Sequence, residues 1–178
     1  MGTKIESIKL FENSISNVKK GDLSELKTLY IEERRGIFLF ILSIVKDYGV
    51  AEDILHDVFI KIIINSEKYK RNTNAKAWIM TIARNLSLNY LNKNKHINFK
   101  ENIEVVANNE LQEIESEFEF LRMIEPLSEI EKQIIIHRLN VGFSYIQKAK
   151  ILDISIVNAR AKYSRGIKKL RLNEKDRI

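Results

Sequence analysis

The chain has 178 residues, a length that fits one ordinary domain or two small ones. Apolar residues make up 44% of it, enough for a packed core, and the absence of cysteine excludes disulfides and thiolate metal sites. Residues 61–95 hold 8 Lys and Arg against 1 Asp and Glu, residues 127–178 hold 12 against 5, and the intervening residues 96–126 hold 2 against 8. Two basic blocks around an acidic one favour two nucleic-acid contacts, although solvated helix faces give the same pattern.

One proline and six glycines are few breakers for this length, so we expect an all-α chain. No apolar run approaches the roughly 18 residues of a membrane span. The first 14 residues carry scattered charges and lack the apolar core of a signal peptide. We therefore expect a soluble cytoplasmic protein without membrane insertion.

The first strong helix signal runs from Asp22 to Gly49. Asp22 with Glu25 fits a capping box, and Gly49 stands where a helix C-terminal glycine belongs. A second helix is predicted over residues 51–66, AEDILHDVFIKIIINS, with an apolar stripe at helical spacing. The stripe consists of Ile54, Leu55, Val58, Phe59, Ile62 and Ile63.

A polar, basic loop, SEKYKRNTNAK, precedes a third helix, AWIMTIARNLSLNYLNKNK. We expect Lys76 and Arg84 on the polar face of this helix. Its core face is predicted to hold Trp78, Ile79, Ile82, Ala83 and Leu86. Periodicity then fades over residues 96–119, which indicates an acidic, flexible linker.

Capping boxes at Ser128 with Glu131 and Ser144 with Gln147 predict two further helices. The second has an inner face of Ile146, Ala149, Ile151 and Leu152, and residues 153–155 supply a turn in which Asp153 tolerates a left-handed conformation. The final helix, capped by Ser155, presents a polar outer face suited to the major groove, where Arg160 and Arg165 can reach guanine edges or phosphates. The outer face comprises Val157, Arg160, Ala161, Ser164, Arg165 and Lys168.

Three motifs in this order resemble the sigma-70 family of bacterial transcription initiation factors, specifically its extracytoplasmic-function (ECF) group. AEDILHDVFIKI is similar to the group's polymerase-binding helix, AWIMTIARNLSLNYLNKNK to its minus-ten helix, and residues 127–170 to its promoter-binding C-terminal module. The resemblance covers roughly residues 20–95 and 120–172. It departs from the usual pattern at His56, where glutamine is common, and at Lys148, where an apolar residue is preferred.

The resemblance implies two small helical domains: a three- or four-helix sigma region 2-like domain over residues 1–95, and a helix–turn–helix, sigma region 4-like domain over 120–178. The linker 96–119 joins them, and we hypothesise that its carboxylates (Glu101, Glu104, Glu110 and Glu113) mimic a nucleic-acid backbone in the polymerase channel. The implied partners are core RNA polymerase, through its β′ clamp helices and β flap, and promoter DNA; an anti-sigma factor is left open. No cofactor, metal or catalytic residue is expected.

The resemblance also assigns site residues. For polymerase binding they are Asp53, His56, Asp57 and Lys61. For the melted minus-ten element they are Lys70, Arg71, Asn72, Asn74, Lys76, Arg84 and Asn85. For the duplex minus-thirty-five element they are Ser155, Val157, Asn158, Arg160, Ala161, Ser164, Arg165 and Lys168.

Two other function classes compete with this interpretation. A free-standing helix–turn–helix regulator that binds duplex DNA without polymerase leaves residues 20–95 without a role. An enzyme is the weakest alternative, because the chain has no catalytic triad, metal-ligand set or nucleotide loop.

Overall fold

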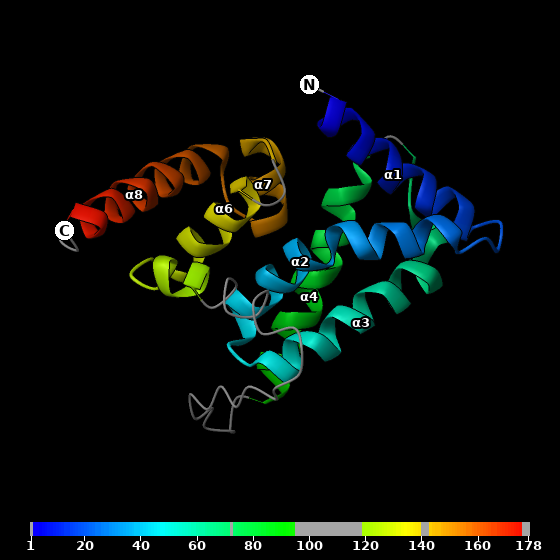
Figure 1. Cartoon of the computed structure of the whole chain (residues 1–178), viewed down its shortest axis with the longest axis horizontal. Helices are drawn as coiled ribbons and strands as arrows, with labels where there is room; N and C mark the ends of the chain where they lie inside the picture. The colour runs from blue at the N-terminus through cyan, green and yellow to red at the C-terminus, as the bar shows by residue number, and fades with distance from the viewer. Residues whose placement is uncertain (1, 72, 95–118, 140–142, 176–178) are drawn as a thin grey trace. The chain divides into compact units, whose positions relative to one another are not determined.

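A computed structural model of the chain describes residues 2–71, 73–94, 119–139 and 143–175, and these ranges contain helices and no strand. The all-α prediction is confirmed. The chain divides into two compact units, Met1–Asn98 (unit 1) and Phe99–Ile178 (unit 2) (Figure 1). Residues 96–118 of the expected linker, and with them the four carboxylates of the channel hypothesis, lie outside the described residues.

Unit 1 is a helical bundle organised around α2. Its elements are α1 (Gly2–Val18), α2 (Ser24–Val45), α3 (Tyr48–Asn65), the short 3₁₀ helix η1 (Ser66–Lys68) and α4 (Ala75–Lys93). The second half of α2, from Ile37 to Val45, is buried on every side, because α1, α3 and α4 all pack against this helix. Figure 1 shows α2 crossing α4, with α3 alongside.

Helix α1 was not predicted from the sequence. It buries Phe11, Ile15 and Val18 at helical spacing, and the Ser14 hydroxyl donates a hydrogen bond of 3.0 Å to the carbonyl of Glu25 on α2. Lys, Glu and Asn residues among these apolar positions mask the stripe in the sequence. The helix is an integral part of the unit 1 core.

Two predicted helix ends in unit 1 are wrong. The Asp22 carboxylate accepts a hydrogen bond from Ser24 N at 2.9 Å, and α2 begins without a side-chain cap, so there is no capping box. Helix α2 ends at the left-handed Lys46 (φ 60°), three residues before Gly49. Gly49 lies in the first turn of α3, because Asp47 caps that helix by accepting a 2.9 Å hydrogen bond from Val50 N.

Unit 2 consists of a helical segment at 119–124 followed by α6 (Glu129–Leu139), α7 (Tyr145–Leu152) and α8 (Ile156–Lys175). Helix α8 packs on both α6 and α7. The core is formed by apolar side chains from all four pieces, which include Ile124, Ile134, Ile135, Ile151 and Ala159. The predicted capping box at Ser144 and Gln147 is confirmed, with hydrogen bonds of 2.8 and 3.4 Å.

Candidate nucleic-acid interface

Helices α7 and α8 form the expected helix–turn–helix. Asp153 ends α7 in the left-handed conformation (φ 54°, ψ 51°), as predicted, and its N–H and that of Ile154 both donate to the carbonyl of Ala149. The Ser155 hydroxyl accepts a 3.1 Å hydrogen bond from Asn158 N. The turn therefore satisfies backbone groups at the end of one helix and the start of the next.

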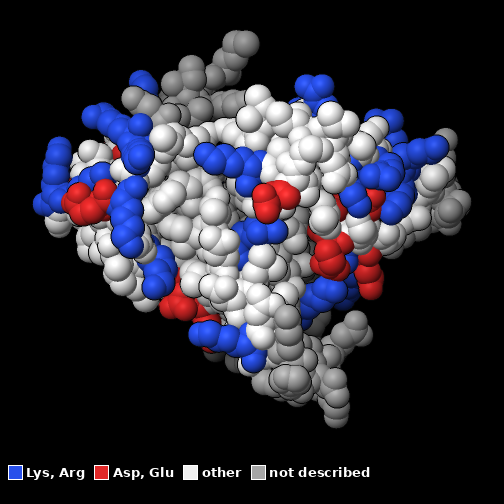
Figure 2. All heavy atoms as spheres, turned by 180° about the vertical axis from the view of Figure 1, so that it is seen from behind, with Lys and Arg blue, Asp and Glu red and all other residues white. Residues whose placement is uncertain are grey.

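The outer face of α8 is open to solvent. The eight residues predicted to contact the minus-thirty-five element are all exposed, and Val157 has 77% of its surface accessible, whereas Ala159 on the opposite face is fully buried. Figure 2 shows Lys and Arg side chains gathered where α8 forms the surface, at the right-hand edge of that view. The helix can present a basic face to DNA, and the base contacts themselves stay predictions.

The inner face of α7 differs from the prediction. Ile146 is 67% exposed, whereas Lys148 is fully buried. Ala149, Ile151 and Leu152 are buried as predicted, and Lys148 takes the inner position that was expected for Ile146. A basic side chain therefore lies in the interior of unit 2.

Lys148 lies between two aromatic rings. Its ammonium is 4.5 Å from the centroid of the Tyr145 ring and 4.9 Å from that of Tyr163. Burial, together with the like charge of Arg138, lowers the pKa of Lys148 to about 8. The guanidinium of Arg160, a predicted base-contacting residue, lies 5.6 Å from the centroid of the same Tyr145 ring. The aromatic pair thus connects a buried cation on α7 with an exposed one on α8.

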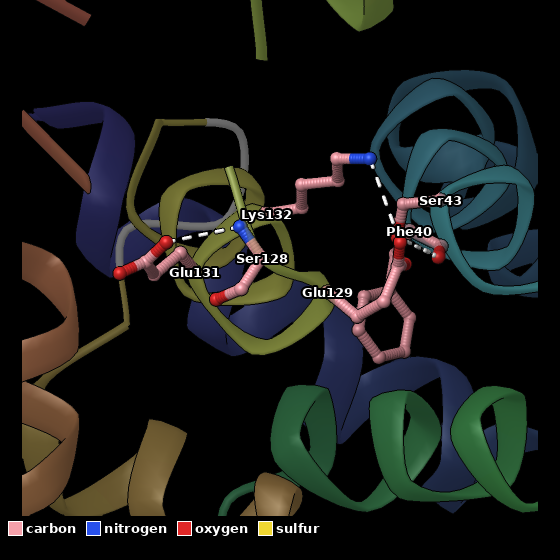
Figure 3. Close-up of polar contacts among 6 residues, drawn as sticks. All are labelled: Phe40, Ser43, Ser128, Glu129, Glu131 and Lys132. Carbon is pink, nitrogen blue, oxygen red and sulfur yellow. Dashed lines mark hydrogen bonds and ion pairs between the residues drawn. The ribbon is translucent and has the colours of Figure 1, made fainter. Parts of the chain in front are cut away.

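Glu131 joins the start of α6 to α8. Figure 3 shows its contact with Ser128 at the start of α6. Its carboxylate accepts hydrogen bonds from Ser128 N at 2.9 Å and from Lys169 Nζ at 2.8 Å, while only 4% of its side chain is exposed. Burial raises the pKa of Glu131, but the hydrogen bonds from Lys169 and Ser128 outweigh that effect and lower it to about 2. Glu131 fixes α8 by a charged anchor in the core.

In unit 1 the predicted minus-ten residues fall into three classes. Lys70, Arg71 and Asn85 are exposed, and Asn72 lies outside the described residues. Asn74 is the left-handed N-cap of α4 (φ 70°), and its side-chain oxygen accepts a 2.8 Å hydrogen bond from Ala77 N. Asparagine tolerates this conformation, so the structure gives Asn74 a capping role that the sequence did not reveal.

Lys76 and Arg84 are less accessible than predicted. The Lys76 ammonium pairs with Glu33 of α2 at 2.9 Å, with side-chain exposures of 13% and 14%, and lies 4.9 Å from the centroid of the Phe11 ring. Arg84 is half-buried. The side chains of Lys76 and Arg84 therefore do not extend from a fully solvent-exposed face, because α1, α2 and α3 all pack against α4.

Tyr69 anchors the loop between η1 and α4, a role that sequence reasoning missed. Its ring is buried 5.3 Å from Trp78, its hydroxyl donates to Glu12 of α1, and its carbonyl accepts a 3.0 Å hydrogen bond from Lys19 Nζ. Burial and the neighbouring Glu12 carboxylate raise the pKa of Tyr69 to about 12. Trp78, predicted to face the core, is half-buried beside it.

The exposed face of α3 combines polar and apolar side chains. Asp53, His56, Asp57 and Lys61 are all exposed, as the resemblance requires of a binding surface. Between them on the same face, Ile60 is 50% and Ile64 65% exposed. These two isoleucines were assigned no role from the sequence, but exposed apolar residues at i and i+4 are a signal of a partner surface. Ile63, predicted to be in the apolar stripe, is 40% exposed.

Within the described ranges, no group of three or more His, Asp and Glu side chains is arranged to hold a metal ion. Over the same ranges, the helices are too short or too polar to cross a membrane.

Comparisons with known proteins find similarity to sigma factors in sequence. The sigma-70 region 2 family matches residues 29–97. The chain is 25% identical over 155 residues to the ECF RNA polymerase sigma factor SigX of Bacillus subtilis, which covers 80% of each chain. It is 30% identical over 73 residues to SigM, another ECF RNA polymerase sigma factor of that organism, which covers 41% of this chain and 42% of SigM.

Two solved structures share the fold. CnrH, solved in complex with the cytosolic domain of CnrY, matches with a TM-score of 0.69 at 13% identity over 94% of this chain and 98% of that one. The sigma factor RpoE of Bartonella quintana, solved in complex with the anti-sigma factor NepR, matches with a TM-score of 0.68 at 23% identity over 85% and 97%.

Proposed function

From the premise that this chain belongs to the ECF group of the sigma-70 family and directs transcription with RNA polymerase, we propose that it divides promoter recognition between its two units. Unit 1 binds core polymerase and melts the minus-ten element, and unit 2 recognises the minus-thirty-five element as duplex. As in the rest of the family, the chain contributes binding and not a catalytic step. It acts in the cytoplasm.

The observation that carries the proposal concerns the outer face of α8. All eight residues that we predict to contact DNA are exposed on it, and the helix follows a turn with capped ends. Arg160, Arg165 and Lys168 supply charge for phosphates or guanine edges. Val157 and Ala161 supply apolar contact suited to thymine methyl groups. A face of this composition binds duplex DNA weakly alone, which suits a subunit that shares its binding free energy with polymerase.

Unit 1 is proposed to capture single-stranded DNA beside the loop at residues 70–73. Lys70 and Arg71 are exposed there, and Asn85 is exposed on α4. Single strands are bound by basic grooves and polar groups that accept unstacked bases. The capping role of Asn74 and the ion pair of Lys76 support an indirect contribution from these two residues, through the position of the loop.

We propose that the exposed face of α3 contacts the β′ clamp helices of polymerase. Ile60 and Ile64 form the apolar centre of this contact, and Asp53, Asp57 and Lys61 form its polar rim. His56 stacks on Tyr30 of α2, with ring centroids 6.5 Å apart, which fixes its place on the surface. An anti-sigma protein is the expected regulatory partner, because RpoE was solved in complex with the anti-sigma factor NepR.

Run-off transcription with core polymerase on fragments of the source genome tests the function directly. We expect discrete transcripts that require both core enzyme and this protein. A mobility-shift assay on the promoters so found should show specific binding with core polymerase and little without it. Tight specific binding by the protein alone favours the free-standing regulator instead.

The polymerase contact has a separate test. Ile64→Glu should weaken binding to core polymerase by tenfold or more, on the order expected for a charge placed at the centre of an interface. Met123→Glu is the matched control, because Met123 is 41% exposed on unit 2. Equal affinities of the two variants for core polymerase contradict the proposed role of α3.

A further inference from the structure

The loop proposed to capture the melted strand is held by a helix that precedes the family match. Sigma-70 region 2 matches from residue 29 onward, whereas α1 ends at Val18. Nevertheless α1 and the residue that follows it both bond to Tyr69. The Tyr69 hydroxyl donates to Glu12 of α1, and the Tyr69 carbonyl accepts from Lys19, directly after the helix. A side-chain group and a main-chain group of one residue are thus fixed by the N-terminal segment.

The far end of the loop is fixed as well. Asn74 caps α4, and Lys76 in the first turn of that helix pairs with Glu33 of α2. The Lys76 ammonium also lies 4.9 Å from the ring centroid of Phe11 on α1. Between the two fixed ends, the Thr73 hydroxyl donates to the carbonyl of Lys70. The exposed residues of the loop therefore extend from a span with two fixed ends. The first end is bonded to Glu12 and Lys19, and the second is fixed by the Asn74 cap and by contacts of Lys76 with α2 and α1.

We propose that α1, with Lys19 directly after it, is a clasp that holds loop residues 69–71 and 73–74 in the conformation required for promoter melting, with Glu12 and Lys19 as positioning residues. This inference rests on the proposed function of unit 1. Binding a strand to a loop that is already ordered avoids the entropic cost of ordering it during melting. The clasp acts through Tyr69 and contacts no DNA itself.

The chain carries its own probe of the clasp, because Trp78 is its single tryptophan and lies 5.3 Å from the Tyr69 ring. Acrylamide quenching of Trp78 in the free protein reports whether the loop is held, independently of polymerase. Permanganate reactivity of minus-ten thymines, in complexes with core polymerase on a promoter found by run-off transcription, reports melting. Affinity for core polymerase is measured for each variant and should not change.

Tyr69→Phe removes only the hydroxyl, so the ring keeps its place in the fold, and Glu12→Leu removes the acceptor. Both should increase quenching of Trp78 and slow melting about five- to tenfold, the effect of one net hydrogen bond. Glu12→Gln retains an acceptor oxygen and should stay within about twofold of the wild type. Lys19→Met should resemble Tyr69→Phe, and the neighbouring exposed Lys20→Met is the matched control.

Unchanged quenching in Tyr69→Phe and Glu12→Leu overturns the clasp. Increased quenching with wild-type melting overturns its role in positioning the loop, and equal defects in Glu12→Gln and Glu12→Leu overturn the hydrogen-bond assignment. If the wild-type complex with polymerase leaves the thymines unreactive, the proposed function of unit 1 is wrong and so is a role of α1 in melting. The quenching result still decides separately whether α1 holds the loop.

Discussion

The two units position the segments that we propose to contact DNA by opposite electrostatic means. In unit 1, the buried Tyr69 hydroxyl has a carboxylate acceptor in Glu12, so a neutral donor meets a charged acceptor. In unit 2, the buried Lys148 ammonium lies between the Tyr145 and Tyr163 rings, and no carboxylate lies within ion-pair distance of it among the described residues. The pKa of Tyr69 is raised and that of Lys148 is lowered.

We infer from this difference that the buried Tyr69 hydroxyl stabilises unit 1, whereas the buried Lys148 ammonium destabilises unit 2. A satisfied hydrogen bond to a charged group contributes about 1.5–3 kcal/mol at best. A buried ammonium loses hydration that two ring faces replace only in part, with a gain of about 2 kcal/mol. Unit 2 therefore depends more on its second anchor, the Glu131–Lys169 pair, for the placement of α8.

The largest effect is expected from Glu131→Ala. Removal of this carboxylate leaves Ser128 N and Lys169 without their acceptor, so the free energy of unfolding of unit 2 should fall by about 2–3 kcal/mol. Urea unfolding of the full chain separates the units, because Trp78 fluorescence reports unit 1 alone and far-ultraviolet circular dichroism reports both. The unfolding transition of unit 2, seen by circular dichroism without a fluorescence change, should shift to lower urea concentration. The transition of unit 1, seen by fluorescence, should not shift.

Glu129→Ala is the matched control for that variant. Glu129 pairs with Lys132 at 3.5 Å with 48% of its side chain exposed (Figure 3), and its loss should cost less than about 0.5 kcal/mol. Because the pKa of Glu131 is lowered from 4.5 to about 2, its contribution is present above pH 4.5 and is lost as the pH falls through about 2. Equal costs for the two variants contradict the anchor role of Glu131.

The second largest effect concerns pH and Lys148. Its pKa is about 8 in the folded chain and 10.5 in the unfolded chain, so between these values the unfolded state binds more protons and stability rises with pH. Unit 2 should gain about 1–2 kcal/mol from pH 7.5 to 10, a value reduced for the ring faces that favour the ammonium. Lys148→Met should abolish the gain, and Lys150→Met, at an exposed site, should retain it.

Unit 1 should respond less and in the opposite direction. Tyr69→Phe removes the hydroxyl donor from Glu12, and the free energy of unfolding should fall by about 1 kcal/mol in the Trp78 transition. Because the pKa of Tyr69 is raised to about 12, its contribution is complete below pH 10 and is lost as the pH rises through about 12. A rise in unit 1 stability over that range contradicts the assignment of Tyr69 as the donor.

These buried groups are also where sequence-based prediction failed, and the reasons are physical. Periodicity placed α3, α4, α7 and α8, and local chemistry identified the turn at Asp153, because both signals act within a few residues. The inner position of Lys148 depends on two tyrosines, one of them on another helix, which replace a carboxylate partner. Charge alone predicts a lysine at the surface.

The contacts of the unit 1 loop could not be predicted from the sequence for a similar reason. The bond from Tyr69 to Glu12 joins residues 57 positions apart, and no local pattern encodes such a contact. The exposure of Ile60 and Ile64 depends on which sides of α3 its neighbours cover. The candidate residues on α8 were placed correctly on its open face because a single helix with one packed side has a strong period.

The smallest effect is expected at the turn between α7 and α8 in unit 2. Asp153 has a φ of 54°, where glycine has no steric cost, so Asp153→Gly should stabilise unit 2 by about 0.5 kcal/mol. Asp153→Ala should destabilise it by about 1 kcal/mol, because alanine lacks the polar side chain that lets aspartate tolerate this conformation. Both shifts should appear only in the transition that leaves Trp78 fluorescence unchanged. A stabilising Asp153→Ala means that the turn is not left-handed in solution, and the exposed face of α8 then loses the geometry on which its proposed contact with DNA depends.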